Sequence, residues 1–174
     1  MDVFGYVPPD EDFNPEHPTT RTEAMHSIVE CLNWSRRNLG VVSTEAGSDW
    51  VIPYVDIVNQ SGSVGKCIPA PLYQLVFHDA VLTTYGAQRN GGVKNLLLGL
   101  LCGGVPELPV ADKDEQSLTL IKQMEALCKR VGLLEMTNHE FLDKDRHRER
   151  STFSDGTTVT VDWTASTAEV NPAL

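Results

Sequence analysis

The chain has 174 residues, enough for one ordinary domain with a sizeable core. Hydrophobic residues make up 41% and charged residues 22%, a composition typical of a folded globular protein and unlike that of a disordered chain. Its 24 acidic and 14 basic side chains give a formal charge of −10, which argues against nucleic acid and anionic membranes as partners because both carry phosphate.

Cysteine spacing and apolar runs argue against further classes of protein. The four cysteines form no CxxC pair, so neither a zinc site nor a disulfide framework is indicated, and we expect buried thiols at Cys31, Cys67, Cys102 and Cys128. No apolar run reaches the ~18 residues that a membrane span requires. Residues 8–18 are rich in proline and acids, unlike a signal peptide. The sequence leaves the compartment and the oligomeric state open.

The chain begins with a predicted strand and a long loop. Residues 1–5 (MDVFG) predict a strand that ends on the carboxylate of Asp2. Because this strand is already finishing near Val3, we expect the natural protein to start upstream of Met1. Residues 5–19 contain four prolines and predict an extended loop.

A helix and a second strand follow. Thr20 and Glu23 form a capping-box pattern, and Gly40 predicts the end of the helix. Between them, apolar residues recur at helical spacing: Met25, Ile28, Val29 and Leu32. Residues 41–45 (VVSTE) predict a strand that ends on a second carboxylate, Glu45. Strand, loop, helix and strand make one βαβ unit, which indicates an α/β fold with parallel strands.

The middle of the chain alternates loops with apolar runs. Residues 47–71 predict a long loop, which in a compact domain is usually functional or a lid. Residues 73–77 (YQLVF) are nearly continuously apolar, typical of a strand buried on both faces, and they end in His78 and Asp79. Residues 95–102 (NLLLGLLC) are consistent with either a strand or a short helix.

The last third predicts a helix, a strand and a hairpin. Ser117 is expected to cap a helix that ends at Gly132, with a buried face made of Leu120, Ile121, Met124, Cys128 and Val131. Residues 133–142 (LLEMTNHEFL) predict the last parallel strand. Residues 152–163 alternate apolar and polar side chains, which indicates an antiparallel hairpin with a type I′ turn at Asp155 and Gly156.

Two carboxylates at the carboxyl ends of neighbouring parallel strands are what glycoside hydrolysis requires, one as nucleophile or base and one as proton donor. Asp2 and Glu45 are the candidates. Glu45 is the stronger, because the small residues 46–48 after it leave room for a ligand; for both, the alternative is an ordinary surface acid. A separation of about 5–5.5 Å would predict retention of configuration, and ~6.5–9.5 Å would predict inversion.

Six further side chains are candidates for binding a sugar: Asp49, Trp50, Tyr54, His78, Asp79 and His139. The first three combine a carboxylate for hydroxyl groups with aromatic faces for a pyranose ring, although packing is the alternative for the aromatics. The histidine–aspartate pair would follow a buried strand, where it could also be structural. His139 would lie at the same end of the predicted parallel strands. No spacing indicates a metal site, an organic cofactor, a P-loop or a nucleophile elbow.

The order of five short motifs resembles a group of (β/α)8-barrel glycosidases: DVFG from Asp2, HPTTR from His17, STEAGSDW from Ser43, LVFHD from Leu75 and FSDG from Phe153. The group contains the endo-α-N-acetylgalactosaminidases and α-N-acetylgalactosaminidases of glycoside hydrolase families 101 and 129, with their uncharacterised relatives. The resemblance covers nearly the whole chain and implies barrel strands 4 to 8 followed by a β-domain. It also implies that Asp2 is the nucleophile and Glu45 the acid/base.

We therefore predict the C-terminal portion of a (β/α)8 (TIM) barrel over residues 1–145 and the first hairpin of a β-sandwich over residues 146–174. The predicted function is a retaining glycosidase acting on an α-galactoside or α-N-acetylgalactosaminide, with carbohydrate as partner and no cofactor. The 174-residue chain by itself is expected to be inactive, because its sheet cannot close. The alternatives are a non-catalytic carbohydrate-binding or structural protein, and a different barrel hydrolase in which these acids bind without cleaving.

Overall fold

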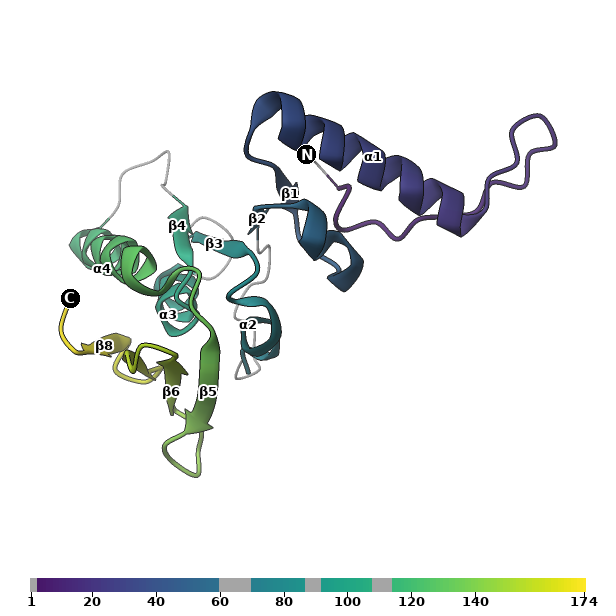
Figure 1. Ribbon diagram of the computed structural model, residues 1–174. Helices are drawn as coiled ribbons and strands as arrows, with labels where there is room; N and C mark the ends of the chain where they lie inside the picture. The colour runs from purple at the N-terminus through teal and green to yellow at the C-terminus, as the bar shows by residue number, and fades with distance from the viewer. Residues whose placement is uncertain (1–2, 60–69, 87–91, 108–113) are drawn as a thin grey trace. The chain divides into compact units, whose positions relative to one another are not determined.

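The computed structural model describes residues 3–59, 70–86, 92–107 and 114–174. The chain divides into two compact units, Met1–Gln60 and Ser61–Leu174, which are coloured from purple to blue and from teal to yellow in Figure 1. Among the described residues, no helix is both long enough and apolar enough to cross a membrane. Each unit is described by itself.

The first unit is organised around one long helix, α1 (Arg21–Leu39). The predicted capping box is confirmed: the Glu23 amide donates to the Thr20 hydroxyl at 3.3 Å, and the Thr20 amide donates to the Glu23 carboxylate at 2.8 Å. Gly40, with φ of 90°, ends the helix as expected. Of the predicted apolar face, Leu32 is fully buried, whereas the three residues nearer the start of the helix are half-buried.

Two short parallel strands follow this helix, β1 (Ser43–Glu45) and β2 (Ile57–Asn59), with Glu45 opposite Asn59. A 3-10 helix, η1 (Asp49–Tyr54), connects them inside the segment predicted to be a loop. The strand predicted over residues 1–5 is wrong in its described part. The chain turns there instead, because the amides of Tyr6 and Val7 both donate to the carbonyl oxygen of Val3.

The second unit begins with α2 (Leu72–Phe77), β3 (Leu82–Gly86), α3 (Val93–Leu101), β4 (Val105–Glu107) and α4 (Glu115–Val131). β3 and β4 form a second parallel pair, with Gly86 opposite Glu107. The strand predicted over residues 73–77 is wrong: this run is helix α2, and it is not buried on all sides, since Leu72 and Val76 are 69% and 64% exposed.

Helix α3 resolves the ambiguity of the leucine-rich run at residues 95–102. It packs against the β3–β4 pair, against α4 and against an antiparallel sheet, so apolar side chains are required around nearly its whole circumference. Gly99 allows the closest approach, because a Cβ atom there would lie 2.9 Å from the Cβ atom of Tyr85. A helix buried on all sides has no amphipathic period, which is why its sequence resembled a buried strand.

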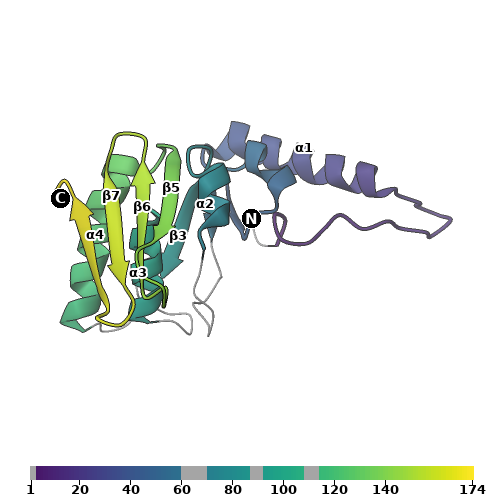
Figure 2. The same ribbon diagram turned by 90° about the horizontal axis from the view of Figure 1, so that it is seen from below.

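The antiparallel sheet consists of β5 (Met136–Phe141), β6 (Arg148–Phe153), β7 (Thr158–Asp162) and β8 (Thr167–Asn171), in that order. Figure 2 shows α3 and α4 covering one of its faces. The hairpin β6–β7 was predicted. The last parallel strand predicted over residues 133–142 is wrong, because β5 pairs antiparallel with β6. The turn is not type I′ either: Gly156 has φ of 86°, but Asp155 is not among the residues with positive φ.

The core of the second unit joins helices and sheet in one cluster, to which α4 contributes much of its predicted apolar face. Asp114, and not Ser117, caps this helix: the Asp114 carboxylate accepts from the amide of Ser117 at 2.8 Å and from its hydroxyl at 2.9 Å. The expectation of buried thiols holds for Cys102, whose pKa burial raises to about 12. It is wrong for Cys31, which is exposed; Cys128 is half-buried, and Cys67 lies outside the described residues.

Candidate active site

The predicted site residues are divided between the two units. Glu45, Asp49, Trp50 and Tyr54 lie in the first unit, and Asp2 precedes its first described residue. The second unit holds the remaining three candidates: His78, Asp79 and His139.

Glu45 is the last residue of β1 and is half-buried. The next residue, Ala46, has a left-handed backbone with φ of 49°, and its amide donates to the Asn59 carbonyl oxygen at 2.9 Å. A left-handed conformation is unusual for alanine and costs free energy, so the surrounding contacts must hold it. The chain therefore bends sharply away from the strand immediately after the carboxylate.

The segment that follows Asp2 is held against this same strand end. The Gly5 amide donates to the Thr44 hydroxyl at 2.8 Å, and the Gly5 carbonyl oxygen accepts from the Ser48 amide at 2.9 Å. Only glycine fits here, because a Cβ atom would lie 2.6 Å from the Thr44 methyl carbon and 2.9 Å from the Ala46 carbonyl oxygen. Gly5, three residues after Asp2, is thus hydrogen-bonded to the residue before Glu45 and to the third residue after it.

Replacing Gly5 by Ala is expected to displace this segment and to cost roughly 1–3 kcal/mol, the usual penalty of overpacking. Limited digestion with chymotrypsin measures the release, as faster cleavage after Phe4 and Tyr6. Adding Thr44→Ser to Gly5→Ala removes the closest methyl contact while keeping the accepting hydroxyl, so it should recover part of the protection. Unchanged digestion of the Gly5→Ala protein would show that this contact does not anchor the segment.

Helix η1 carries Asp49, Trp50 and Tyr54, the acid and the two aromatic residues that were predicted to bind a sugar. The Asp49 carboxylate accepts from the Trp50 amide at 2.9 Å; Asp49 is exposed, whereas Trp50 and Tyr54 are half-buried. Another acid of this segment, Asp56, is structural. It accepts from the Val42 amide at 2.8 Å and from the Arg36 guanidinium at 2.9 Å, and so ties α1 to the two strands.

His78 was predicted to follow a strand, but it lies at the end of helix α2. Its ring is buried, its Nδ1 atom is hydrogen-bonded to the Leu134 carbonyl oxygen, and it packs on Phe153 with 5.0 Å between ring centroids. These contacts leave little of the imidazole for a ligand. The neighbouring Asp79 is exposed.

His139 lies on β5 in a buried polar network that the sequence reading missed. Its Nε2 atom is 2.8 Å from the Glu149 carboxylate, and the other carboxylate oxygen of Glu149 accepts from the Trp163 indole at 2.6 Å. The side chains of His139 and Glu149 are 6% and 0% exposed. The detectable signal was alternation along β6, which places Glu149 on the same face as Ser151 and Phe153.

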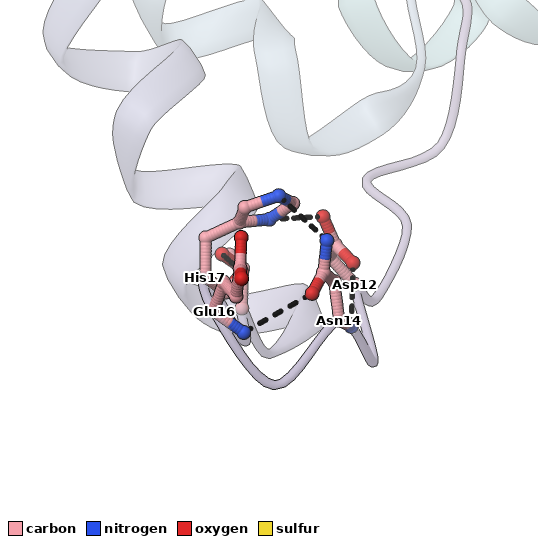
Figure 3. Close-up of polar contacts among 5 residues, drawn as sticks. Asp12, Asn14, Glu16 and His17 are labelled. Carbon is pink, nitrogen blue, oxygen red and sulfur yellow. Dashed lines mark hydrogen bonds and ion pairs between the residues drawn. The ribbon is translucent and has the colours of Figure 1, made fainter.

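The proline-rich loop before α1 folds back on itself (Figure 3). Asp12 and Thr19 exchange backbone hydrogen bonds, and the His17 ring lies between Asp12, at 2.9 Å, and Asn14, at 2.9 Å. Within the described part of the chain, no group of three or more His, Cys, Asp and Glu side chains could hold a metal ion. Asp12, Asn14 and His17 contact one another within this loop.

Comparisons with known proteins find that the chain is similar to one segment of a glycosidase. No family model and no curated protein matches the chain. Solved structures of α-N-acetylgalactosaminidase NagBb from Bifidobacterium bifidum do match: the ligand-free form is 33% identical over 98% of this chain, with a TM-score of 0.83. The Gal-NHAc-DNJ complex is 32% identical over 99% of this chain, with a TM-score of 0.86.

The chain spans only about three tenths of those structures, covering 30% and 31% of their length. It is therefore structurally similar to a segment of a glycoside hydrolase, and the resemblance seen in the sequence is confirmed at this coarse level. The closed barrel and the assignment of each site residue stay predictions.

Proposed function

We propose that this chain supplies the two catalytic carboxylates of a retaining glycosidase that acts on α-N-acetylgalactosaminides. Asp2 is the nucleophile and Glu45 is the acid/base. The observation that carries the proposal is the hydrogen bonding of Gly5 to Thr44 and Ser48, which flank Glu45 in the sequence, since it holds a residue three positions after Asp2 at the strand end that carries Glu45. β1 to β4 are assigned as the fifth to eighth strands of the barrel within residues 1–145, and residues 146–174 as part of the β-domain.

The chemistry needs only these two groups. Asp2 attacks the anomeric carbon while Glu45 donates a proton to the departing glycosidic oxygen, which leaves the sugar covalently attached to Asp2. Glu45, now ionised, removes a proton from water, and the water oxygen displaces Asp2 from the anomeric carbon. Two inversions give net retention, and both carboxyl groups return to their starting protonation states.

The residues after Glu45 are proposed to bind the sugar. Asp49 is exposed and can accept hydrogen bonds from hydroxyl groups, while Trp50 and Tyr54 supply aromatic faces. His78, Asp79 and His139 stay predictions for this role. Of these three, Asp79 has the most open surroundings, because both histidine side chains are buried in contacts with the protein.

The choice of sugar rests on the solved relatives. NagBb is named an α-N-acetylgalactosaminidase, and its structures include complexes with GalNAc and with Gal-NHAc-DNJ. At 31% to 34% identity over nearly the whole of this chain, the same acetamido-bearing sugar is the best-supported substrate. An unsubstituted α-galactoside is the second choice.

The test is hydrolysis of aryl α-glycosides by the full-length protein. We expect turnover of the α-N-acetylgalactosaminide at least about tenfold faster than of the α-galactoside, because a pocket built to hydrogen-bond the acetamido group rejects a sugar that lacks it. Proton NMR at early times should show the α-anomer as the first product. If the β-anomer forms first, Asp2 is not a nucleophile. Sugar binding without any turnover would favour the non-catalytic carbohydrate-binding alternative.

A further inference from the structure

We propose that Asn59 is a positioning residue for the acid/base, Glu45, and that its carboxamide donates a hydrogen bond to the Glu45 carboxyl group during both steps of the reaction. The inference rests on the proposed function and adds a residue that acts through Glu45. Both residues belong to the first unit, in which they end the neighbouring parallel strands β2 and β1 (Figure 1).

The register of the two strands places these side chains next to each other. Glu45 lies directly opposite Asn59, and the amide of the following residue, Ala46, donates to the Asn59 carbonyl oxygen at 2.9 Å, so the pairing extends to the end of both strands. Neighbouring strands of a sheet are about 4.8 Å apart, and residues opposite each other in a parallel pair point to the same face. At this spacing the carboxamide and the carboxyl group are within hydrogen-bonding reach of each other.

The face that carries both side chains is the more open face of the strand pair. Burial alternates along each strand: Thr44 and Val58 are 2% and 0% exposed, whereas Glu45 and Asn59 are half-buried. Because side chains alternate between the two faces of a strand, Thr44 and Val58 occupy the packed face, and Glu45 and Asn59 lie on the other. Glu45 is therefore accessible to a substrate on the same face on which Asn59 lies beside it.

The chemistry of an acid/base suits a neutral N–H donor as its neighbour. Glu45 is protonated when the glycosidic bond breaks and ionised when water is activated, and in both states one of its oxygens must face the substrate. The other oxygen accepts hydrogen bonds in either state, and the Asn59 carboxamide has N–H donors for it. A neutral donor can hold the carboxyl group in one direction throughout the reaction, whereas a cationic donor would favour only the ionised state.

The experiment measures kcat/KM of the full-length protein for an alkyl and for a dinitrophenyl α-N-acetylgalactosaminide. An alkoxide needs the proton that Glu45 donates, whereas a dinitrophenolate leaves without it, so misplacement of Glu45 slows cleavage of the alkyl glycoside selectively. Asn59→Leu replaces the carboxamide by an apolar group of similar size. It should lower kcat/KM for the alkyl glycoside roughly 10- to 100-fold, the effect of losing a hydrogen bond to an ionisable group, and leave the value for the dinitrophenyl glycoside close to that of wild type.

Two matched variants separate this role from folding. Asn38→Leu makes the same substitution at an exposed position of α1 in the same unit, and it should leave both kcat/KM values unchanged. Val58→Ala alters the adjacent residue on the packed face, where it should lower the melting temperature without distinguishing the two leaving groups. If Asn59→Leu lowers both kcat/KM values equally, or lowers neither, the inference is overturned. If that protein does not fold, Asn59→Ala should show the selective loss, and equal effects on the two glycosides overturn the inference instead.

The two proposals fail in different ways. A wild-type protein that cleaves neither glycoside removes the proposed function and this inference together. A wild-type protein that cleaves both, with a selective loss of the alkyl glycoside in Glu45→Gln but not in Asn59→Leu, leaves the glycosidase in place and removes only the role of Asn59.

Discussion

Replacing Glu45 by Gln is expected to lower kcat/KM for an alkyl α-N-acetylgalactosaminide by roughly 10²- to 10⁴-fold, the usual contribution of general acid–base catalysis. An alkoxide is a poor leaving group and needs the proton that Glu45 supplies. A dinitrophenolate is stable without that proton, so the dinitrophenyl glycoside should still form the covalent intermediate at close to the normal rate. The variant should then accumulate the intermediate, because no base remains to activate water.

Rescue by azide tests this prediction most directly. It attacks the intermediate without a general base, so adding azide should restore turnover of the dinitrophenyl glycoside by the Glu45→Gln protein and yield the α-glycosyl azide, the product of double inversion. Glu30→Gln is the matched control, an exposed acid on α1 of the same unit that should leave turnover unchanged. Equal losses for both leaving groups with no azide rescue would mean that Glu45 binds the substrate or holds the fold but does not transfer the proton.

The sequence predicted best those elements whose signals are local. Thr20 and Glu23 are three residues apart, and their capping box depends on nothing outside the first helical turn. Gly40 ends that helix for an equally local reason, its positive φ. The β6–β7 hairpin was also recognisable, since two-residue alternation and a short Asp-Gly connection require no knowledge of the rest of the molecule.

The predictions were wrong where the tertiary environment determines the secondary structure of a segment or the partner of a strand. The run at residues 73–77 has the composition of a buried strand, yet Leu72 and Val76 are exposed on α2 while Gln74 is buried and hydrogen-bonded to Tyr85. Residues 133–142 carry no signal that distinguishes a parallel partner from an antiparallel one. β5 pairs with β6 because the next segments of chain fold back on it, and this register places His139 near Glu149.

The candidate site follows the same pattern, because residues with a local signal were predicted and contacts that depend on the fold were not. Glu45 could be selected because a strand-ending acid followed by small residues is visible in the sequence, and β1 does end on it. The buried partner of His139 could not be identified, because Glu149 lies on the neighbouring strand β6 and only the fold brings the two side chains together. The pairing of β5 with β6 creates that contact, and a single sequence does not encode register in a readable form.

The largest loss of stability is expected from Glu149→Ala, at about 3–5 kcal/mol, because it breaks a fully buried hydrogen-bonded group by removing its acceptor. The His139 imidazole and the Trp163 indole would both lose their partner in a region where the Glu149 side chain is 0% exposed. Glu149→Gln keeps an acceptor oxygen for the indole and an amide group that can hydrogen-bond to the imidazole. Its cost should be about 1 kcal/mol, the net worth of an ordinary hydrogen bond.

Urea denaturation of the full-length protein measures these losses, and hydrogen exchange of the β6 and β7 peptides locates them in the sheet. Glu169→Ala, at an exposed position on β8, is the matched control and should stay within about 0.5 kcal/mol of wild type. The loss of stability should be largest for Glu149→Ala, smaller for Glu149→Gln and smallest for Glu169→Ala. If Glu149→Ala costs no more than Glu169→Ala, the buried network does not stabilise the sheet.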